Sequence, residues 1–178
     1  MIGRSVVGAV LAVGVARAEA QVRAGVVGAP AVGKAAPALV LPYFTGAGAG
    51  PHDQPFRLGA ELGRSVVLVF GPATDSTRWR LVGALADSSW TKAVVAGAVR
   101  GTPAAVGALA GVVGSERLKL LADSTGRGHR RFGVRAHQWT VFVVDDAGRV
   151  AFRAATDPTA PPTALDIAGA IDRSQPPR

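Results

Sequence analysis

The residues best placed to do chemistry are the hydroxyl and acidic side chains that follow the apolar run at 65–70. A hydroxyl nucleophile such as Ser76 or Thr77 would need a base, for which His137 is a candidate, and an orienting acid, for which Asp75 is a candidate. Asp75 and Ser76 are neighbours and therefore point in different directions, and no nucleophile-elbow pattern surrounds them. We expect Asp75 or Ser76 to cap the following helix rather than to serve a hydrolase.

The residues for thiol and metal chemistry are equally sparse. The chain has no cysteine, so it cannot carry out a thiolate, sulfenic acid or disulfide step by itself. His52 and Asp53 are adjacent, while His129 and His137 lie eight positions apart beside several arginines. None of these spacings is typical of a zinc or calcium site. The sequence therefore predicts no metal site and no cofactor, with the histidines facing solvent.

Apolar runs alternate with helical patterns along most of the chain. The run at 65–70 lies between glycines and is typical of a strand buried on both faces. Thr102 and Pro103 predict a helix start, and Gly114 predicts its end. Strands are expected at 38–41, 65–70, 93–99, 118–122, 140–145 and 149–153, and helices at 79–85, 103–113, 130–132 and 164–171.

Several of these segments resemble the peroxiredoxins, the alkyl hydroperoxide reductase/thiol-specific antioxidant (redoxin) family of the thioredoxin superfamily. Gly33 and Pro37 match the opening motif of the family, and Pro72 follows the first central strand as it does there. The resemblance covers about residues 33–172. It implies an α/β thioredoxin-like three-layer sandwich, with a central mixed sheet of about five strands flanked by helices. A different α/β fold of similar length is the alternative.

The resemblance also locates the redox site and shows that its chemistry is missing. In the family, a Thr and the peroxidatic Cys follow Pro72 in a Pro-x-x-x-Thr-x-x-Cys motif, and an Arg from a neighbouring strand stabilises the thiolate. Here Ser76 replaces the Thr, Trp79 the Cys and Trp139 the Arg, while Arg135 is out of register by four residues. The resemblance therefore implies no catalytic residue at these degenerate positions. We expect Trp79 and Trp139 to approach each other and fill the site; the alternative is an aromatic cleft for a small apolar or planar ligand.

The amino-terminal residues are typical of an export signal. Arg4 precedes an apolar stretch at 5–15, and Ala18 and Ala20 form a small-x-small cleavage site. The predicted organisation is a signal peptide at 1–20, a flexible lead-in at 21–32, the thioredoxin-like domain at 33–172 and a tail at 173–178. We expect export to the periplasm, the cell envelope or the extracellular space, with no transmembrane segment after signal removal. An uncleaved anchor helix is the alternative.

The formal net charge of +8 favours anionic surroundings. One cluster of basic residues stands out, and a solvated helix face is preferred for it over an anion-binding surface. No aromatic residues are interleaved for stacking on bases, so specific nucleic-acid binding is not expected. The cluster consists of Arg127, Arg130, Arg131 and Arg135, with His129 among them.

These patterns predict a non-catalytic binding or scaffolding module for a protein or a small ligand, with antioxidant oxidoreductase ancestry. The alternative is an oxidoreductase or antioxidant activity retained by a cysteine-independent route or through a partner that supplies the thiol. The third tryptophan, Trp90, is expected at the end of the first helix, in ordinary packing.

Overall fold

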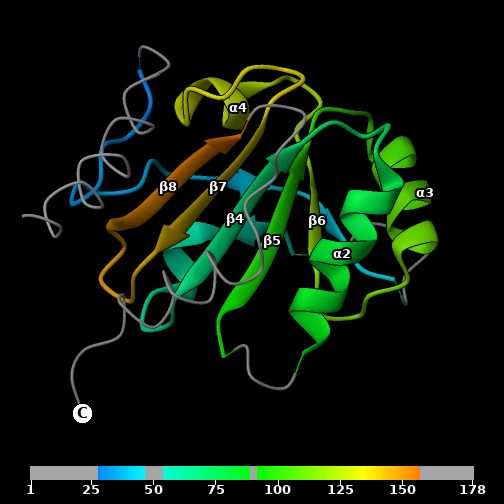
Figure 1. Cartoon of the computed structure of the whole chain (residues 1–178), viewed down its shortest axis with the longest axis horizontal. Helices are drawn as coiled ribbons and strands as arrows, with labels where there is room; N and C mark the ends of the chain where they lie inside the picture. The colour runs from blue at the N-terminus through cyan, green and yellow to red at the C-terminus, as the bar shows by residue number, and fades with distance from the viewer. Residues whose placement is uncertain (1–27, 47–53, 89–91, 157–178) are drawn as a thin grey trace, which may run out of the picture.

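The computed structural model describes residues 28–46, 54–88 and 92–156. A six-stranded mixed sheet with strand order β2-β6-β5-β4-β7-β8 forms its centre, and β1 and β3 make a small second sheet (Figure 1). The elements in chain order are β1 (Val40–Leu41), β2 (Tyr43–Phe44), β3 (Phe56–Arg57), the 3-10 helix η2 (Leu58–Glu61), β4 (Val66–Gly71), α2 (Ser76–Asp87), β5 (Val94–Val99), α3 (Pro103–Val113), β6 (Lys119–Ala122), α4 (Arg127–Arg131), β7 (Trp139–Val144) and β8 (Val150–Thr156).

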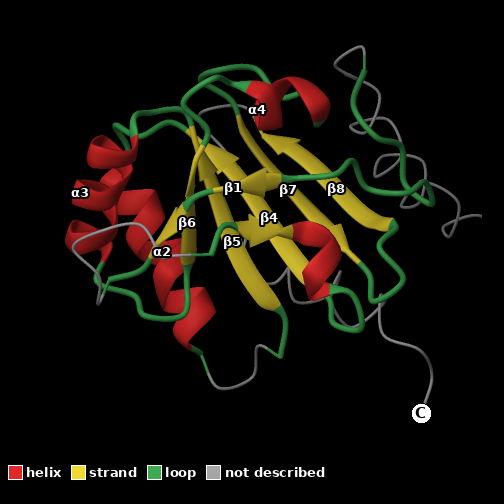
Figure 2. Cartoon of the chain, turned by 180° about the vertical axis from the view of Figure 1, so that it is seen from behind, coloured by secondary structure: helices red, strands yellow, loops and turns green. Residues whose placement is uncertain are grey.

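Two apolar cores lie on the two faces of the central sheet. Helices α2 and α3 cover one face, where Val67 and Val69 of β4 point. The other face carries Leu68 and Phe70 and is covered by η2, α4 and the small sheet. Figure 2 shows this second face, with β1 crossing the sheet and α4 at its upper end. The α/β sandwich expected from the sequence is confirmed, and its sheet has six strands rather than about five.

The central strand β4 is buried along its whole length. It runs parallel to β5, with Val67 opposite Val95, and antiparallel to β7, with Val67 opposite Val143. A strand with neighbours on both edges and helices or loops on both faces must be apolar throughout. The continuous apolar run at 65–70 therefore follows directly from the burial of β4 on both faces.

Differences from the expected elements are concentrated at the amino-terminal edge. The strand expected at 38–41 is only β1, which pairs with β3 in the small sheet. The sixth strand of the main sheet is β2, which pairs antiparallel with β6 through Tyr43 and Leu121. Two-residue strands have too few positions to show an alternating pattern, so the sequence did not predict β2.

Both long helices begin, and α3 also ends, where their capping residues predict. The Asp75 side chain accepts a hydrogen bond from the Arg78 backbone N–H at 3.1 Å and is the N-cap of α2. Thr102 caps α3 through Ala105 N–H at 3.3 Å, and Gly114 ends that helix in the left-handed conformation with φ +73°. These caps satisfy backbone groups that a helix end leaves without partners.

Several expectations lie outside the described residues. They concern the signal at 1–20, most of the lead-in at 21–32, His52 with Asp53, Trp90, the helix at 164–171 and the tail at 173–178. Helix α2 ends at Asp87, before Trp90. Within the described ranges, no helix is long and apolar enough to cross a membrane.

The expectation that His129 faces solvent is wrong. His129 lies in α4 and is 3% exposed, and its ring packs edge-on against Phe70 at 5.1 Å between centroids. Its backbone N–H donates to Asp123 Oδ2, and its ring Nδ1 also lies 2.8 Å from that oxygen. His137, by contrast, is exposed. The arginines around His129 mask its burial, because a five-residue helix can expose three arginines and still turn one side chain inward.

The Asp123 carboxyl group holds α4 to the end of β6. Burial by itself raises the pKa of Asp123, but hydrogen bonds from the His129 ring and backbone, and from the Gly128 backbone, lower the pKa below the ordinary value of 3.8. A carboxylate that is more acidic in the folded state stabilises that state above the unfolded pKa, and its contribution is lost as the pH falls through the folded pKa. Asp123 should therefore contribute fully at neutral pH and progressively less below about pH 4.

Replacing Asp123 by Asn should lower the free energy of unfolding at pH 7 by about 1–3 kcal/mol, because it weakens buried charge-assisted hydrogen bonds. The difference between wild type and variant should shrink as the pH falls below 3.8. Urea unfolding at pH 7, 5 and 3 measures both effects. Asp146→Asn, at an exposed position, is the matched control and should be near neutral. A D123N chain as stable as wild type at pH 7 would contradict the assignment.

Candidate functional site

The candidate site is the turn between β4 and α2, at the carboxyl end of the central strand. Gly71 ends β4, Pro72 follows it, and Asp75 starts α2. Ser76 is the first helical residue and is half-buried, and Trp79 lies one turn further along. The strand, the turn and the helix cap therefore fix the positions of Pro72, Ser76 and Trp79.

Trp79 is buried completely beneath this turn. Its side chain is 0% exposed, and its indole Nε1–H donates a hydrogen bond to the Pro72 carbonyl at 2.9 Å. This bond satisfies the one polar group of the indole, which a buried tryptophan requires. The first turn of α2 is thereby joined to the loop that precedes it.

Trp139 meets Trp79 from the neighbouring strand. It is the first residue of β7, is 4% exposed, and its ring lies 4.9 Å from that of Trp79 between centroids, at an interplanar angle of 47°. The structure thus brings Pro72, Trp79 and Trp139 together. Two indoles in contact fill this corner of the sheet with apolar volume.

Two glycines make room for the indoles. A Cβ atom built on Gly71 would lie 2.7 Å from the Trp139 ring, and one built on Gly97 of β5 would overlap the Trp79 ring. The Gly97 position would also place a Cβ 2.9 Å from Leu120 Cδ2. Real Cβ atoms do not approach other carbon atoms so closely. Any residue larger than glycine at position 71 or 97 would therefore displace the indole that now occupies this space.

Arg78 extends the aromatic pair toward solvent. Its Nε lies 3.1 Å from Asp75 Oδ2, and its guanidinium carbon lies 5.7 Å from the centroid of the Trp139 ring. A cation over an indole face is an attractive arrangement. The sequence analysis missed Arg78, although its position three residues after the N-cap Asp75 is a detectable signal.

The other candidate residues do not form a catalytic group. In the described part of the chain, no hydrogen bond joins Ser76 or Thr77 to His137, and Asp75 is engaged at the helix cap and with Arg78. Arg135 is exposed. No three acidic or histidine side chains among the described residues gather closely enough to hold a metal ion. The tryptophan corner contributes apolar packing and the cation of Arg78, but its described residues form no nucleophile–base pair.

Replacing Gly97 by Ala should lower the free energy of unfolding by about 1–3 kcal/mol, because the new methyl group would displace Trp79 or Leu120 in a filled core. Gly111→Ala is the matched control: Gly111 is exposed in α3 with nothing near its Cβ position. That change should be neutral or stabilising by up to about 1 kcal/mol through helix propensity. Urea unfolding followed by tryptophan fluorescence measures both. Equal effects of the two changes would show that the corner is not filled as described.

Comparison with known proteins identifies the fold. No protein-family profile and no curated protein matches the chain. Among solved structures, the reduced 2-Cys peroxiredoxin of Plasmodium vivax superposes with a TM-score of 0.67 at 20% identity, covering 79% of this chain and 80% of that one. A peroxiredoxin-like protein from Aquifex aeolicus gives 0.67 at 17% identity, covering 83% and 89%. The exposed lipoprotein thioredoxin of Streptococcus pneumoniae gives 0.57 at 17%, covering 76% and 98%. The chain therefore has the thioredoxin-like fold in its peroxiredoxin-like form.

Proposed function

We propose that this protein is an exported, non-catalytic binding or scaffolding module derived from an antioxidant oxidoreductase. One observation carries the proposal: in a chain without cysteine, Trp79 is buried against Trp139, and the motif resemblance assigns to Trp79 the place of the family's cysteine. The likeness to redox proteins of the thioredoxin fold supports the ancestry. The filled corner explains how the fold persists without the ancestral chemistry.

Export is the second part of the proposal. It is supported by the pattern at 1–20, in which a basic residue, a short apolar stretch and a small-x-small site follow one another. The absence of cysteine suits a domain that needs no disulfide for stability, since its two cores are already large. The periplasm, the cell envelope and the extracellular space are the proposed locations.

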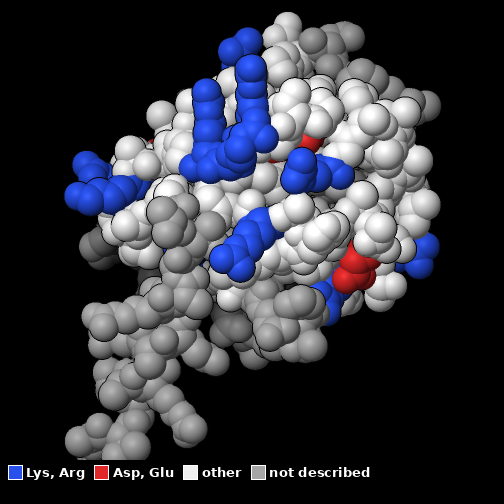
Figure 3. Space-filling model, turned by 90° about the horizontal axis from the view of Figure 1, so that it is seen from above, with Lys and Arg blue, Asp and Glu red and all other residues white. Residues whose placement is uncertain are grey.

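A basic surface at the end of the molecule that carries α4 is the proposed contact for an anionic partner. Arg127, Arg130, Arg131 and Arg135 are all exposed, and Arg100 lies beside Arg130 across Gly126. Figure 3 shows Lys and Arg side chains gathered on this end, with few acidic ones among them.

Two of these arginines also stabilise the fold. Arg130 donates to the Thr125 carbonyl at 2.9 Å, and Arg131 donates to the Ala38 carbonyl at 2.8 Å. The surface is therefore held in place, and a solvated helix face, the interpretation preferred from the sequence, remains the competing role for it.

The purified protein should not consume hydrogen peroxide. Peroxide loss with dithiothreitol should equal that of a buffer blank, because no residue can form the sulfenic acid of the thiol-dependent cycle. A thiol peroxidase at equal concentration is the positive control. Repeating the assay with thioredoxin, its reductase and NADPH tests the alternative in which a partner supplies the thiol. Turnover above the blank in either assay would contradict the proposal.

A further inference from the structure

A pocket of about 350 Å³ lies at the end of the sheet opposite to the tryptophan corner. Its walls are formed by residues at the amino-terminal ends of the parallel strands β5 and β6, by β2 and by the segment before β4. Its volume is within the range of small-molecule sites. The lining residues are Tyr43, Thr45, Arg64, Ala86, Lys92, Ala93, Val94, Val95, Glu116, Arg117 and Lys119.

Positive charge dominates the walls of this pocket. Arg64, Lys92, Arg117 and Lys119 line it together with a single acidic residue, Glu116. These cations come from three separate parts of the chain, with Arg117 and Lys119 in the same segment, so the sequence alone does not show them as one cluster. Their convergence on one cavity is a property of the fold.

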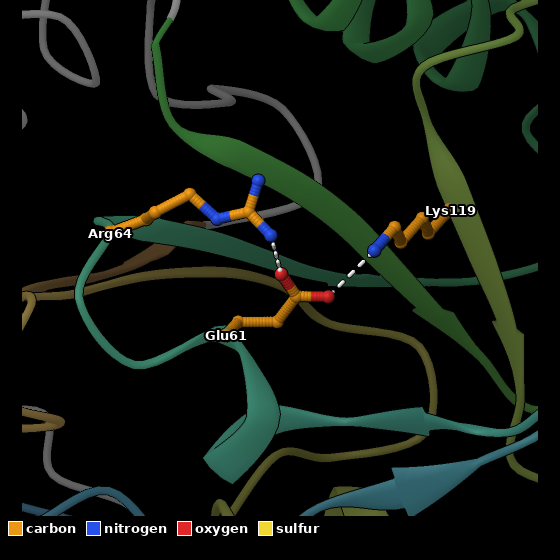
Figure 4. Close-up of polar contacts among 3 residues, drawn as sticks. All are labelled: Glu61, Arg64 and Lys119. Atoms are coloured by element: carbon orange, nitrogen blue, oxygen red, sulfur yellow. Dashed lines mark hydrogen bonds and ion pairs between the residues drawn. The ribbon is translucent and has the colours of Figure 1, made fainter.

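A buried carboxylate orients two of the cations. Glu61 is 7% exposed; its Oε2 lies 2.5 Å from Arg64 Nη2 and its Oε1 lies 2.6 Å from Lys119 Nζ (Figure 4). Both side chains reach Glu61 from opposite sides (Figure 4). An arginine carries five N–H donors and a lysine three, so each cation retains donors beyond the one that contacts Glu61.

Aromatic rings restrain Lys119 further. Its Nζ lies 5.6 Å from the ring centroid of Tyr43 and 5.5 Å from that of Phe56. A lysine held between a carboxylate and two ring faces loses less conformational entropy when it binds a ligand than a free surface lysine does. Tyr43 also lines the pocket, so its side chain forms part of the wall that a ligand would meet.

Nearby carboxylates reduce the positive charge without cancelling it. Asp87 accepts from the Arg117 backbone N–H at 3.3 Å, which places a third carboxylate close to the four cations, beside Glu61 and Glu116. One positive charge remains in excess. The uncharged part of the lining consists of Tyr43, Thr45 and four aliphatic residues, Ala86, Ala93, Val94 and Val95.

We propose that this pocket binds a small organic anion, with a phosphate or carboxylate head at the cations and an apolar or aromatic body against Tyr43 and the aliphatic wall. This goes beyond the proposed function, since it requires neither the tryptophan corner nor the absence of peroxidase activity. Ligand binding and peroxide turnover are measured separately, so either proposal can fail alone.

Isothermal titration calorimetry of the full chain with phenyl phosphate at low salt tests the pocket. We expect saturable one-to-one binding. Inorganic phosphate should bind several-fold more weakly because it lacks the apolar body, and benzyl alcohol should give no binding because it lacks the charge. No saturation by about 10 mM phenyl phosphate, well above a millimolar Kd, would overturn the proposal. So would equal affinity for phenyl phosphate and inorganic phosphate.

Lys92→Ala separates the pocket from the general charge of the protein. Lys92 is exposed, so the variant should fold, and the affinity for phenyl phosphate should fall by about tenfold through loss of one cationic contact. Arg64→Gln provides a second test at the Glu61 cluster, with a similar loss expected. Lys34→Ala removes the same charge beside β8, at the opposite edge of the sheet from the pocket, and should change the affinity by less than about twofold, as expected for a distant, screened charge. Equal losses for Lys92→Ala and Lys34→Ala would show non-specific attraction and overturn the proposal.

Discussion

The contact between Trp79 and Trp139 is the interaction on which this end of the structure depends. The two rings meet 4.9 Å apart at the junction of α2, β4 and β7. The space they need exists because Gly71 and Gly97 have no side chain on that face of the sheet. The hydrogen bond from Trp79 to the Pro72 carbonyl then joins the aromatic pair to the turn. The contact between the indoles, the absence of side chains at the two glycines and the conformation of the turn at Pro72 therefore depend on one another.

The two ends of the sheet differ in chemistry. At the carboxyl end of β4, apolar volume fills the corner, and exposed arginines lie around α4. At the opposite end, a buried carboxylate holds two of the cations that line a cavity. Pockets depend on how strand ends and loops meet, so a thioredoxin-like fold can bind ligands at more than one place along its sheet. The proposed binding pocket is therefore independent of the tryptophan corner.

The fold was predictable where a local signal is strong. The buried run of β4 and the caps Asp75, Thr102 and Gly114 each express a requirement of one short segment, and the structure has each of them. Strand β2 was missed because two residues carry no periodicity. His129 was assigned to the surface because its neighbours are arginines, while its burial depends on Asp123, six residues away in the chain.

The site was only partly predictable for the same reason. The motif spacing brought attention to Pro72, Ser76, Trp79 and Trp139, but the sequence does not show that Gly97 lies under an indole. That contact depends on the register of β5 against β4 and on the tilt of α2. The basic pocket was missed altogether, because its cations are brought together only when β5 and β6 pair in parallel.

The most direct test of the central claim is a double-mutant cycle on Trp79 and Trp139. Unfolding free energies of Trp79→Leu, Trp139→Leu and the double variant, from urea titrations read by circular dichroism, give the coupling between the two rings. Packed indoles should show a coupling of about 0.5–1.5 kcal/mol beyond their separate burial. Strictly additive losses, with a coupling near zero, would mean that the two tryptophans do not fill the corner together and would contradict this account.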